Sequence, residues 1–154
     1  MYLIPAPAKL EEREGSFLLS CETYLTVDPA CSWKVNRQAD LFNEEVKKIL
    51  GYGAMLTRGC AQAGDIVIRQ DDSAAPQSYV LDIAEDSITL TWEEAGLWYG
   101  MQTLRQILEQ NGAILPCLHI EDAPDLPNRG YYFDCTRGRI PTMDWLKKLV
   151  DRMA

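Results

Sequence analysis

Several features that would point to a metal, a membrane or a nucleic acid are scarce in this sequence of 154 residues. It has a single histidine, His119, and no Cys-x-x-Cys pair among its five cysteines, which argues against a zinc site. No run of about 20 apolar residues occurs, so no membrane-spanning helix is predicted. Basic side chains number 15 against 23 acidic ones, and the net charge of −8 argues against binding to nucleic acid or anionic lipid. We therefore expect no metal, cofactor, nucleic-acid partner or membrane partner.

The cysteines and the N-terminus bear on the cellular compartment. The cysteines are odd in number and widely spaced, a pattern typical of reduced thiols in a cytoplasmic protein: Cys21, Cys31, Cys60, Cys117 and Cys135. The first 20 residues contain two prolines and a charged run over 11–14, unlike a signal peptide. We expect a cytoplasmic protein, and the alternative is a secreted protein whose leader has been removed.

The composition that is present is that of a folded chain. Hydrophobic residues make up 47% of it and charged residues 25%, which is enough to bury a core and excludes disorder. The charge is uneven along the chain. Residues 1–121 hold 9 basic and 18 acidic side chains, whereas residues 122–154 hold 6 and 5. This difference indicates that the C-terminal segment belongs to a different structural unit.

Apolar patterning over the first 120 residues predicts strands and two helices in mixed order. One helix is expected from the N-cap Ser32 to the terminator Gly51, and another over 94–110 before Asn111-Gly112. Strands are expected over 16–20, 23–27, 54–57, 65–70, 77–84, 87–92 and 114–120, with a two-residue hairpin turn at 85–86. The predicted fold class is α+β, with two helices covering one face of a mixed or antiparallel sheet.

The segment after residue 122 has a different character. Two prolines and no periodicity over 123–128 predict a linker between a domain at 1–122 and a unit at 129–154. In this unit an aromatic strand over 131–133, a loop and a helix capped by Thr142 form one β/α unit. A single β/α unit cannot bury both faces of its strand, so we expect the end of the chain to be a cut.

Residue types alone offer few catalytic candidates in the N-terminal part. His119 stands in an apolar strand, where a structural imidazole is favoured over a catalytic one. The carboxylate pairs Asp71-Asp72 and Glu93-Glu94 lie in a polar turn and at a helix start, where solvation or the helix dipole explains them. Trp92, Trp98 and Tyr99 would suit a sugar-stacking platform, but packing in the core is the favoured interpretation.

The C-terminal unit carries the more suggestive cluster. Arg129 precedes the predicted strand, and Asp134 and Arg137 follow it at the end where parallel β/α folds place their sites. An arginine there could donate paired hydrogen bonds to hydroxyls or to a carboxylate. A salt bridge between Arg137 and Asp134 that only fixes the loop explains the spacing equally well.

Four phrases, in order along the chain, resemble those of one enzyme family. They are LIPAP at 3–7, EAGLWYGMQTL at 94–104, IEDAP at 120–124 and RGYYFDCTRGRIP at 129–141. Together they resemble glycoside hydrolase family 20, the β-N-acetylhexosaminidases. The resemblance implies an N-terminal α+β accessory domain over 1–122, followed by the first strand and helix of a (β/α)8 catalytic barrel, the remainder of which this chain lacks.

The resemblance also implies an activity. The family cleaves terminal β-linked N-acetylhexosamine with retention and uses the substrate's own acetamido oxygen as nucleophile. An Asp-Glu pair orients the acetamido group and protonates the leaving oxygen, and in the family this pair lies downstream of the present region. The parent protein is therefore expected to be a glycoside hydrolase that acts on glycans, and this fragment alone is expected to be inactive, with no catalytic residue of its own.

One site residue is carried over from the family. Arg137 matches the arginine that binds hydroxyls of the terminal sugar, with Asp134 as a support and Arg129 as a structural residue. Two positions depart from the family pattern: Thr136 replaces the usual serine, and Gly138 stands where histidine is common. The second departure concerns substrate preference.

Two other interpretations remain open at this point. The chain could be a non-catalytic module that binds glycans or a partner, with Trp33, Trp92 and Trp98 as candidate contacts. It could also be the accessory domain of another glycosidase, such as an α-glucuronidase, in which Arg137 would meet a different sugar.

Overall fold

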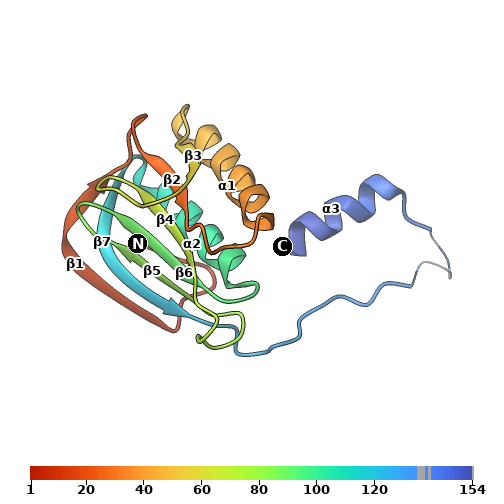
Figure 1. The fold of residues 1–154 in the computed structure, drawn as a ribbon. Helices are drawn as coiled ribbons and strands as arrows, with labels where there is room; N and C mark the ends of the chain where they lie inside the picture. Colours follow the sequence, from red (N-terminus) through yellow and green to blue (C-terminus); the bar gives the residue numbers. More distant parts are fainter. Residues whose placement is uncertain (135–137, 139, 154) are drawn as a thin grey trace. The chain divides into compact units, whose positions relative to one another are not determined.

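The first of two compact units, Met1–Pro124, is built on one seven-stranded sheet. The structure is a computed structural model that describes residues 1–134, 138 and 140–153. The strands are β1 (Lys9–Leu18), β2 (Tyr24–Val27), β3 (Met55–Arg58), β4 (Ile66–Gln70), β5 (Tyr79–Ile83), β6 (Ile88–Trp92) and β7 (Ile114–Asp122). Their order across the sheet is β1-β7-β5-β6-β4-β2-β3 (Figure 1).

The sheet is mixed, as the sequence predicts. Strands β2, β3, β4 and β6 run parallel, whereas β5 pairs antiparallel with both β6 and β7, and β1 pairs antiparallel with β7. The predicted hairpin joins β5 to β6: Ile83 pairs with Ile88, and the Ala84 N–H donates to the Ser87 carbonyl at 2.9 Å. The α+β prediction with a mixed sheet is therefore confirmed for this unit.

Two helices, α1 (Lys34–Leu50) and α2 (Gly96–Asn111), cover one face of this sheet (Figure 1). Each buries an apolar stripe at three- and four-residue spacing: Val35, Ala39, Phe42 and Val46 on α1, and Leu97, Met101, Leu104, Ile107 and Leu108 on α2. Gly51 ends α1 in the left-handed conformation (φ 82°), as predicted from its position. In the described part of the chain, no helix is both long and apolar enough to span a membrane.

The opposite face of the sheet is polar near β1, β7 and β5. On β5 the residues Tyr79, Leu81 and Ile83 are buried on the helix side, whereas Val80 and Asp82 alternate with them and are partly exposed. His119 and Glu121 on β7 follow the same alternation. This helix-free face, called the open face below, therefore carries ionisable side chains.

Strand β1 is longer than the sequence predicts. The expected strand starts at residue 16, but the structure places Lys9–Leu18 in β1, with an irregular register between Glu12 and Ser16. Most of the residues that were missed are charged, and two of them, Lys9 and Arg13, pair with Glu121 on β7 and Asp82 on β5. Gly15, within the irregularity, has φ 100°, which favours glycine.

The second unit, Asp125–Ala154, contains one helix, α3 (Met143–Met153), among its described residues. The predicted cap is confirmed, because Thr142 Oγ1 accepts the Trp145 N–H at 3.3 Å. The strand expected over 131–133 is not formed in this chain, since residues 131–134 have no strand conformation. A strand requires a neighbour to accept its backbone hydrogen bonds, and the described part of this unit offers none.

Candidate functional site

The sequence-predicted site residues all belong to the second unit. Arg137, the predicted sugar-binding residue, lies outside the described residues. Asp134 is half-buried and Arg129 is exposed. The Arg129 guanidinium donates to the carbonyl oxygen of Leu126, which is consistent with the structural role expected of it. The alternative of a salt bridge between Arg137 and Asp134 also falls outside the described residues.

Aromatic side chains in this unit contact one another. The ring centroid of Phe133 lies 5.2 Å from that of Trp145 on α3, and 6.3 Å from that of Tyr131. Ring pairs at such distances attract beyond the area they bury. Phe133 therefore packs on the helix of its own unit, whereas Tyr132 is 90% exposed.

The glycines of the 94–104 phrase act in packing. A Cβ atom on Gly96 would lie 1.8 Å from the Ser78 carbonyl oxygen, and one on Gly100 would lie 2.3 Å from Leu90 Cδ1. Only residues without a side chain allow α2 to approach β5 and β6 so closely. The phrase that carries the family resemblance is therefore a helix–sheet packing motif in the first unit.

Two glutamines of α2 hold the N-terminal segment. Gln106 Oε1 accepts the Ile4 N–H and its Nε2 donates to the Ile4 carbonyl, both at 2.9 Å. Gln110 does the same with Tyr2, at 2.9 and 2.6 Å. Because Gln106 and Gln110 are four residues apart, they lie on the same side of the helix. Each side-chain amide accepts the N–H and donates to the carbonyl of one backbone residue, as a neighbouring strand would. These bonds hold the start of the 3–7 phrase on α2.

Asp122 of the 120–124 phrase joins three parts of the first unit. Its Oδ1 accepts the Ala8 N–H at 3.1 Å, and its Oδ2 accepts from the Tyr79 hydroxyl at 3.3 Å. The Tyr79 hydroxyl also lies 2.7 Å from Thr103 Oγ1 on α2. Burial raises the pKa of Tyr79 well above its ordinary value, so this hydroxyl stays protonated. Asp122 therefore has a structural role at the end of β7.

One member of each carboxylate pair, Asp71 and Glu93, accepts hydrogen bonds from a nearby turn or loop. Asp71 Oδ1 accepts both the Ser73 N–H at 2.9 Å and its hydroxyl at 2.6 Å, and these bonds lower the pKa of Asp71. Glu93 Oε2 accepts the Gln77 N–H at 3.0 Å. The polar-turn interpretation is confirmed for Asp71, and Glu93 supports a loop in which Gln77 has φ 61°.

The three aromatic residues of the sugar-platform hypothesis do not form one exposed surface. Trp92 is 7% exposed and belongs to the core, and Trp98 and Tyr99 on α2 are half-buried, with Tyr99 packed against the core. Trp33, a candidate of the binding-module interpretation, is 75% exposed. A stacking platform needs an accessible ring face, which Trp92 cannot offer. The core interpretation is confirmed for Trp92.

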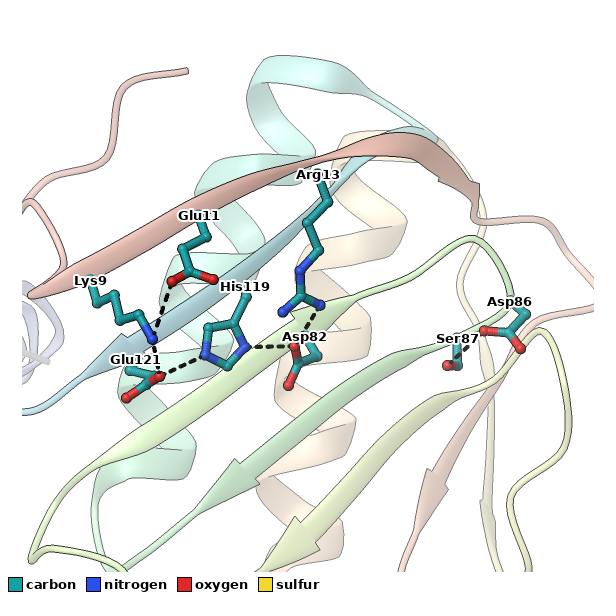
Figure 2. A network of polar contacts seen from close by, with 8 residues as sticks. All are labelled: Lys9, Glu11, Arg13, Asp82, Asp86, Ser87, His119 and Glu121. Atoms are coloured by element: carbon teal, nitrogen blue, oxygen red, sulfur yellow. Dashed lines mark hydrogen bonds and ion pairs between the residues drawn. The ribbon is translucent and has the colours of Figure 1, made fainter.

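His119 lies at the centre of a polar network on the open face (Figure 2). Its Nδ1 is 2.6 Å from Asp82 Oδ1 on β5, and its Nε2 is 2.8 Å from Glu121 Oε1 on β7. Arg13 donates to the same Asp82 oxygen at 3.2 Å, and Lys9 donates to the same Glu121 oxygen at 2.7 Å. The structural role predicted for His119 is confirmed.

These contacts set the charge states of the network. The carboxylates of Glu121 and Asp82 raise the pKa of His119 above its usual range, because they stabilise the imidazolium. Lys9 and His119 in turn lower the pKa of Glu121. Lys9, Arg13 and Glu121 were not predicted as partners of this network, although the two-residue spacing of Lys9, Glu11 and Arg13 is typical of one face of a strand.

The described residues contain no group of three or more histidine, cysteine or acidic side chains placed to hold a metal ion. The four cysteines among them, Cys21, Cys31, Cys60 and Cys117, are free thiols. Burial raises the pKa of the Cys31 and Cys117 thiols, which makes them poor nucleophiles. The polar groups described above have hydrogen-bond partners within the first unit.

Comparison with known proteins identifies this unit as a glycosidase accessory domain. A family model described as glycosyl hydrolase family 20, domain 2, matches residues 1–123. The chain belongs to glycoside hydrolase family 20, and its N-terminal α+β unit is the accessory domain of that family.

Curated relatives and solved structures agree with this assignment. The chain is 24% identical to a β-hexosaminidase of Vibrio furnissii over 99% of its own length and 24% of the relative's. It is 27% identical to one of Porphyromonas gingivalis over 99% of its own length and 21% of the relative's. The chain thus spans about a quarter of these relatives.

Among solved structures, a mutant β-hexosaminidase of Streptomyces plicatus in complex with product (GlcNAc) superposes with a TM-score of 0.82 at 27% identity. The alignment covers 97% of this chain and 31% of the Streptomyces plicatus chain. An exo-β-N-acetylglucosaminidase of Vibrio harveyi in complex with N-acetylglucosamine gives a TM-score of 0.77 at 22% identity, and the alignment covers 98% of this chain and 23% of that one. The second comparison bears on the fold alone.

Proposed function

We propose that this chain is the N-terminal part of an exo-β-N-acetylhexosaminidase that hydrolyses terminal β-linked N-acetylhexosamine with retention. The observation that carries the proposal is the family match over residues 1–123, together with β-hexosaminidase relatives that align over 99% of the chain. The N-acetylglucosamine named for the Streptomyces plicatus structure supports glycans of this type as the substrate of the parent protein.

In this proposal residues 129–154 are the first strand and helix of a (β/α)8 barrel. The relatives align through this segment, and α3 begins at a capped residue as a barrel helix would. The aromatic segment 131–133 would become a strand once neighbouring barrel strands accept its backbone hydrogen bonds. The linker at 123–128 then separates the accessory domain from the catalytic one.

The chemistry is expected to come from residues that this chain does not supply. The substrate's acetamido oxygen would attack the anomeric carbon, a downstream aspartate would orient it, and a downstream glutamate would protonate the leaving oxygen. Among the described residues the candidate acids and bases are already engaged: His119 between two carboxylates, and Asp71 and Glu93 in loops. We therefore propose that the chain alone is inactive.

Arg137 is the one residue of this chain that we propose to contact the sugar. A guanidinium at the end of the first barrel strand can donate two parallel hydrogen bonds to neighbouring hydroxyls. Asp134 would hold that guanidinium, and Arg129, which donates to the Leu126 carbonyl, would shape the entry of the strand. The free thiols of the first unit support a cytoplasmic location, which is also a proposal.

Substitution of Arg137 in the longer protein tests this assignment. We expect Arg137→Ala to lower kcat/KM for 4-nitrophenyl N-acetyl-β-glucosaminide by about 100-fold, and Arg137→Lys to recover only part of it, because lysine cannot donate as a planar pair. The matched control is Arg152→Ala, at the end of α3, which should leave the rate unchanged. A normal rate in Arg137→Ala would rule out the sugar-binding role. Turnover of an aryl α-glucuronide instead would favour the α-glucuronidase interpretation.

A further inference from the structure

The two ring nitrogens of His119 face one carboxylate oxygen each. Nδ1 lies 2.6 Å from Asp82 Oδ1, and Nε2 lies 2.8 Å from Glu121 Oε1. A neutral imidazole has one N–H and one lone pair, so one of these contacts would set a lone pair against a carboxylate oxygen. Only the imidazolium donates in both directions. The geometry therefore corresponds to a protonated His119, independently of any titration.

The surrounding charges balance only when His119 is protonated. The six members, called the His119 network below, are Lys9, Glu11 and Arg13 on β1, Asp82 on β5, and His119 and Glu121 on β7 (Figure 2). Along the network, Arg13, Asp82, His119, Glu121, Lys9 and Glu11 alternate in sign. With the imidazolium there are three positive and three negative groups. Its deprotonation gives the network a net charge of −1 and leaves a neutral ring between two carboxylates.

All strands that flank His119 contribute to this network. Across the ladders, His119 pairs with Glu11 of β1 on one side and with Asp82 of β5 on the other. The next residue of the same face along β7 in one direction is Glu121, and in the other it is Cys117, whose buried thiol is neutral. The charged side chains that face His119 are therefore those already named.

The network lies over the weaker half of β1. Residues Lys9–Glu12 pair with Leu118–Glu121, and all four are exposed, with Leu10 at 38%. Beyond the irregularity, Ser16–Leu18 pair with Ile114–Pro116, and Phe17 is 1% exposed in the core. The second half of β1 is thus anchored by apolar burial, whereas the first half depends on ladder hydrogen bonds and on the ion pairs. Segments with few buried apolar contacts open first.

We infer that the His119 network is a proton-dependent fastener: protonated His119, opposite Glu11 in the ladder, strengthens the hold of Lys9–Glu12 on β7, and loss of the proton weakens that hold while the Lys9–Glu121 and Arg13–Asp82 pairs remain. The raised pKa of His119 agrees with this arrangement. The sign follows from it: the contribution of His119 to the fastening is complete below the ordinary histidine value of about 6.5 and is lost as the pH rises through the higher folded-state pKa. The second half of β1 is expected to stay in place.

The chain contains one histidine, so NMR can follow this proton without ambiguity. Titration of the His119 ring nitrogens should give a pKa above that of a histidine in an unfolded peptide. Asp82→Asn and Glu121→Gln should each lower it. The matched control Glu45→Gln, which removes an exposed carboxylate paired with Lys48 on α1, should leave it unchanged. A pKa at or below the unfolded value would overturn the inference.

Amide hydrogen exchange over the same pH range tests this weakening directly. After correction for intrinsic rates, protection within Leu10–Glu12 should fall about two- to fivefold as His119 deprotonates, while protection of Phe17 and Leu18 stays constant. His119→Gln should show the lower protection at every pH. Equal changes in both halves of β1, or no change in either, would contradict the inference. Because the wild-type chain alone decides this, the test holds even if His119→Gln folds poorly.

Discussion

Gly96 lies so close to Ser78 that a methyl group on it would stand 1.8 Å from the Ser78 carbonyl oxygen. This contact sets the distance between α2 and the start of β5, where the helix covers the centre of the sheet. The Ser78 carbonyl oxygen is a backbone atom, so it cannot rotate away as the end of a flexible side chain can. The packing of the accessory domain therefore depends on the absence of a side chain at this position.

Gly96→Ala should destabilise the chain by more than about 3 kcal/mol, because helix or strand must shift to admit the methyl group. Gly100→Ala should cost less, since its nearest neighbour is the side-chain end Leu90 Cδ1. Gly59→Ala is the control, with no atom within 4 Å of the added carbon. Urea unfolding followed by far-ultraviolet circular dichroism measures all three. Equal stabilities of Gly96→Ala and Gly59→Ala would show that this contact does not limit the packing.

Asn43 is a second position where one side chain holds the backbone of another element. Its Nδ2 donates to the Ala54 carbonyl at 2.8 Å, its Oδ1 accepts the Ala54 N–H at 2.9 Å, and it is 7% exposed. Asn43→Ala leaves both buried backbone groups without partners and should cost about 2–4 kcal/mol. Lys47→Ala, which removes only an exposed ion pair of the same helix, should cost less than about 0.5 kcal/mol. The same denaturation experiment compares them, and similar losses in both variants would count against the role of Asn43.

The unfolding free energy should depend on pH through the titration of His119. Its pKa is raised in the folded state, so its contribution is full below the unfolded value and disappears as the pH rises through the folded value. The difference in unfolding free energy between the wild type and His119→Gln should therefore shrink between pH 6 and pH 9. Urea titrations of both proteins across this range measure it. A difference that grows with pH would show that His119 is neutral in the folded state.

Glycan binding by the first unit is not expected. Trp92 is buried, and the exposed Trp33 on the N-terminal side of α1 has no second exposed tryptophan in this unit to form a platform. Titration with N-acetylglucosamine oligosaccharides should leave tryptophan emission unchanged in both the wild type and Trp33→Phe. A saturable change that Trp33→Phe abolishes would support the binding-module interpretation instead.

Most of the fold of the first unit could be predicted from local patterns. The apolar stripes of α1 and α2 and the alternation of β5 and β6 each specify an element and its buried face. The first half of β1 could not be found in this way, because it has no buried apolar side and is held by ladder hydrogen bonds to β7 and by ion pairs with β7 and β5. The pairing of Arg13 with Asp82 is long-range in sequence, and a single sequence does not reveal it.

The roles of the candidate site residues were harder to predict from the sequence than the fold. The family phrases could be found, but Gly96 and Asp122 within them hold packing and hydrogen-bond positions in the accessory domain. The strand over 131–133 was predicted from its aromatic residues, whereas pairing partners decide whether a strand forms. Phe133 contacts Trp145 of α3 instead.

The central claim is that this chain is the accessory part of a hexosaminidase whose catalytic pair lies elsewhere in the parent protein. The most direct test compares hydrolysis of 4-nitrophenyl N-acetyl-β-glucosaminide by the 154-residue chain and by the protein encoded by the complete native reading frame. We predict no turnover by the chain and measurable turnover by the longer protein, lost when an adjacent Asp-Glu pair in it is changed to Asn-Gln. Turnover by the chain alone, or none by the longer protein, would contradict the account.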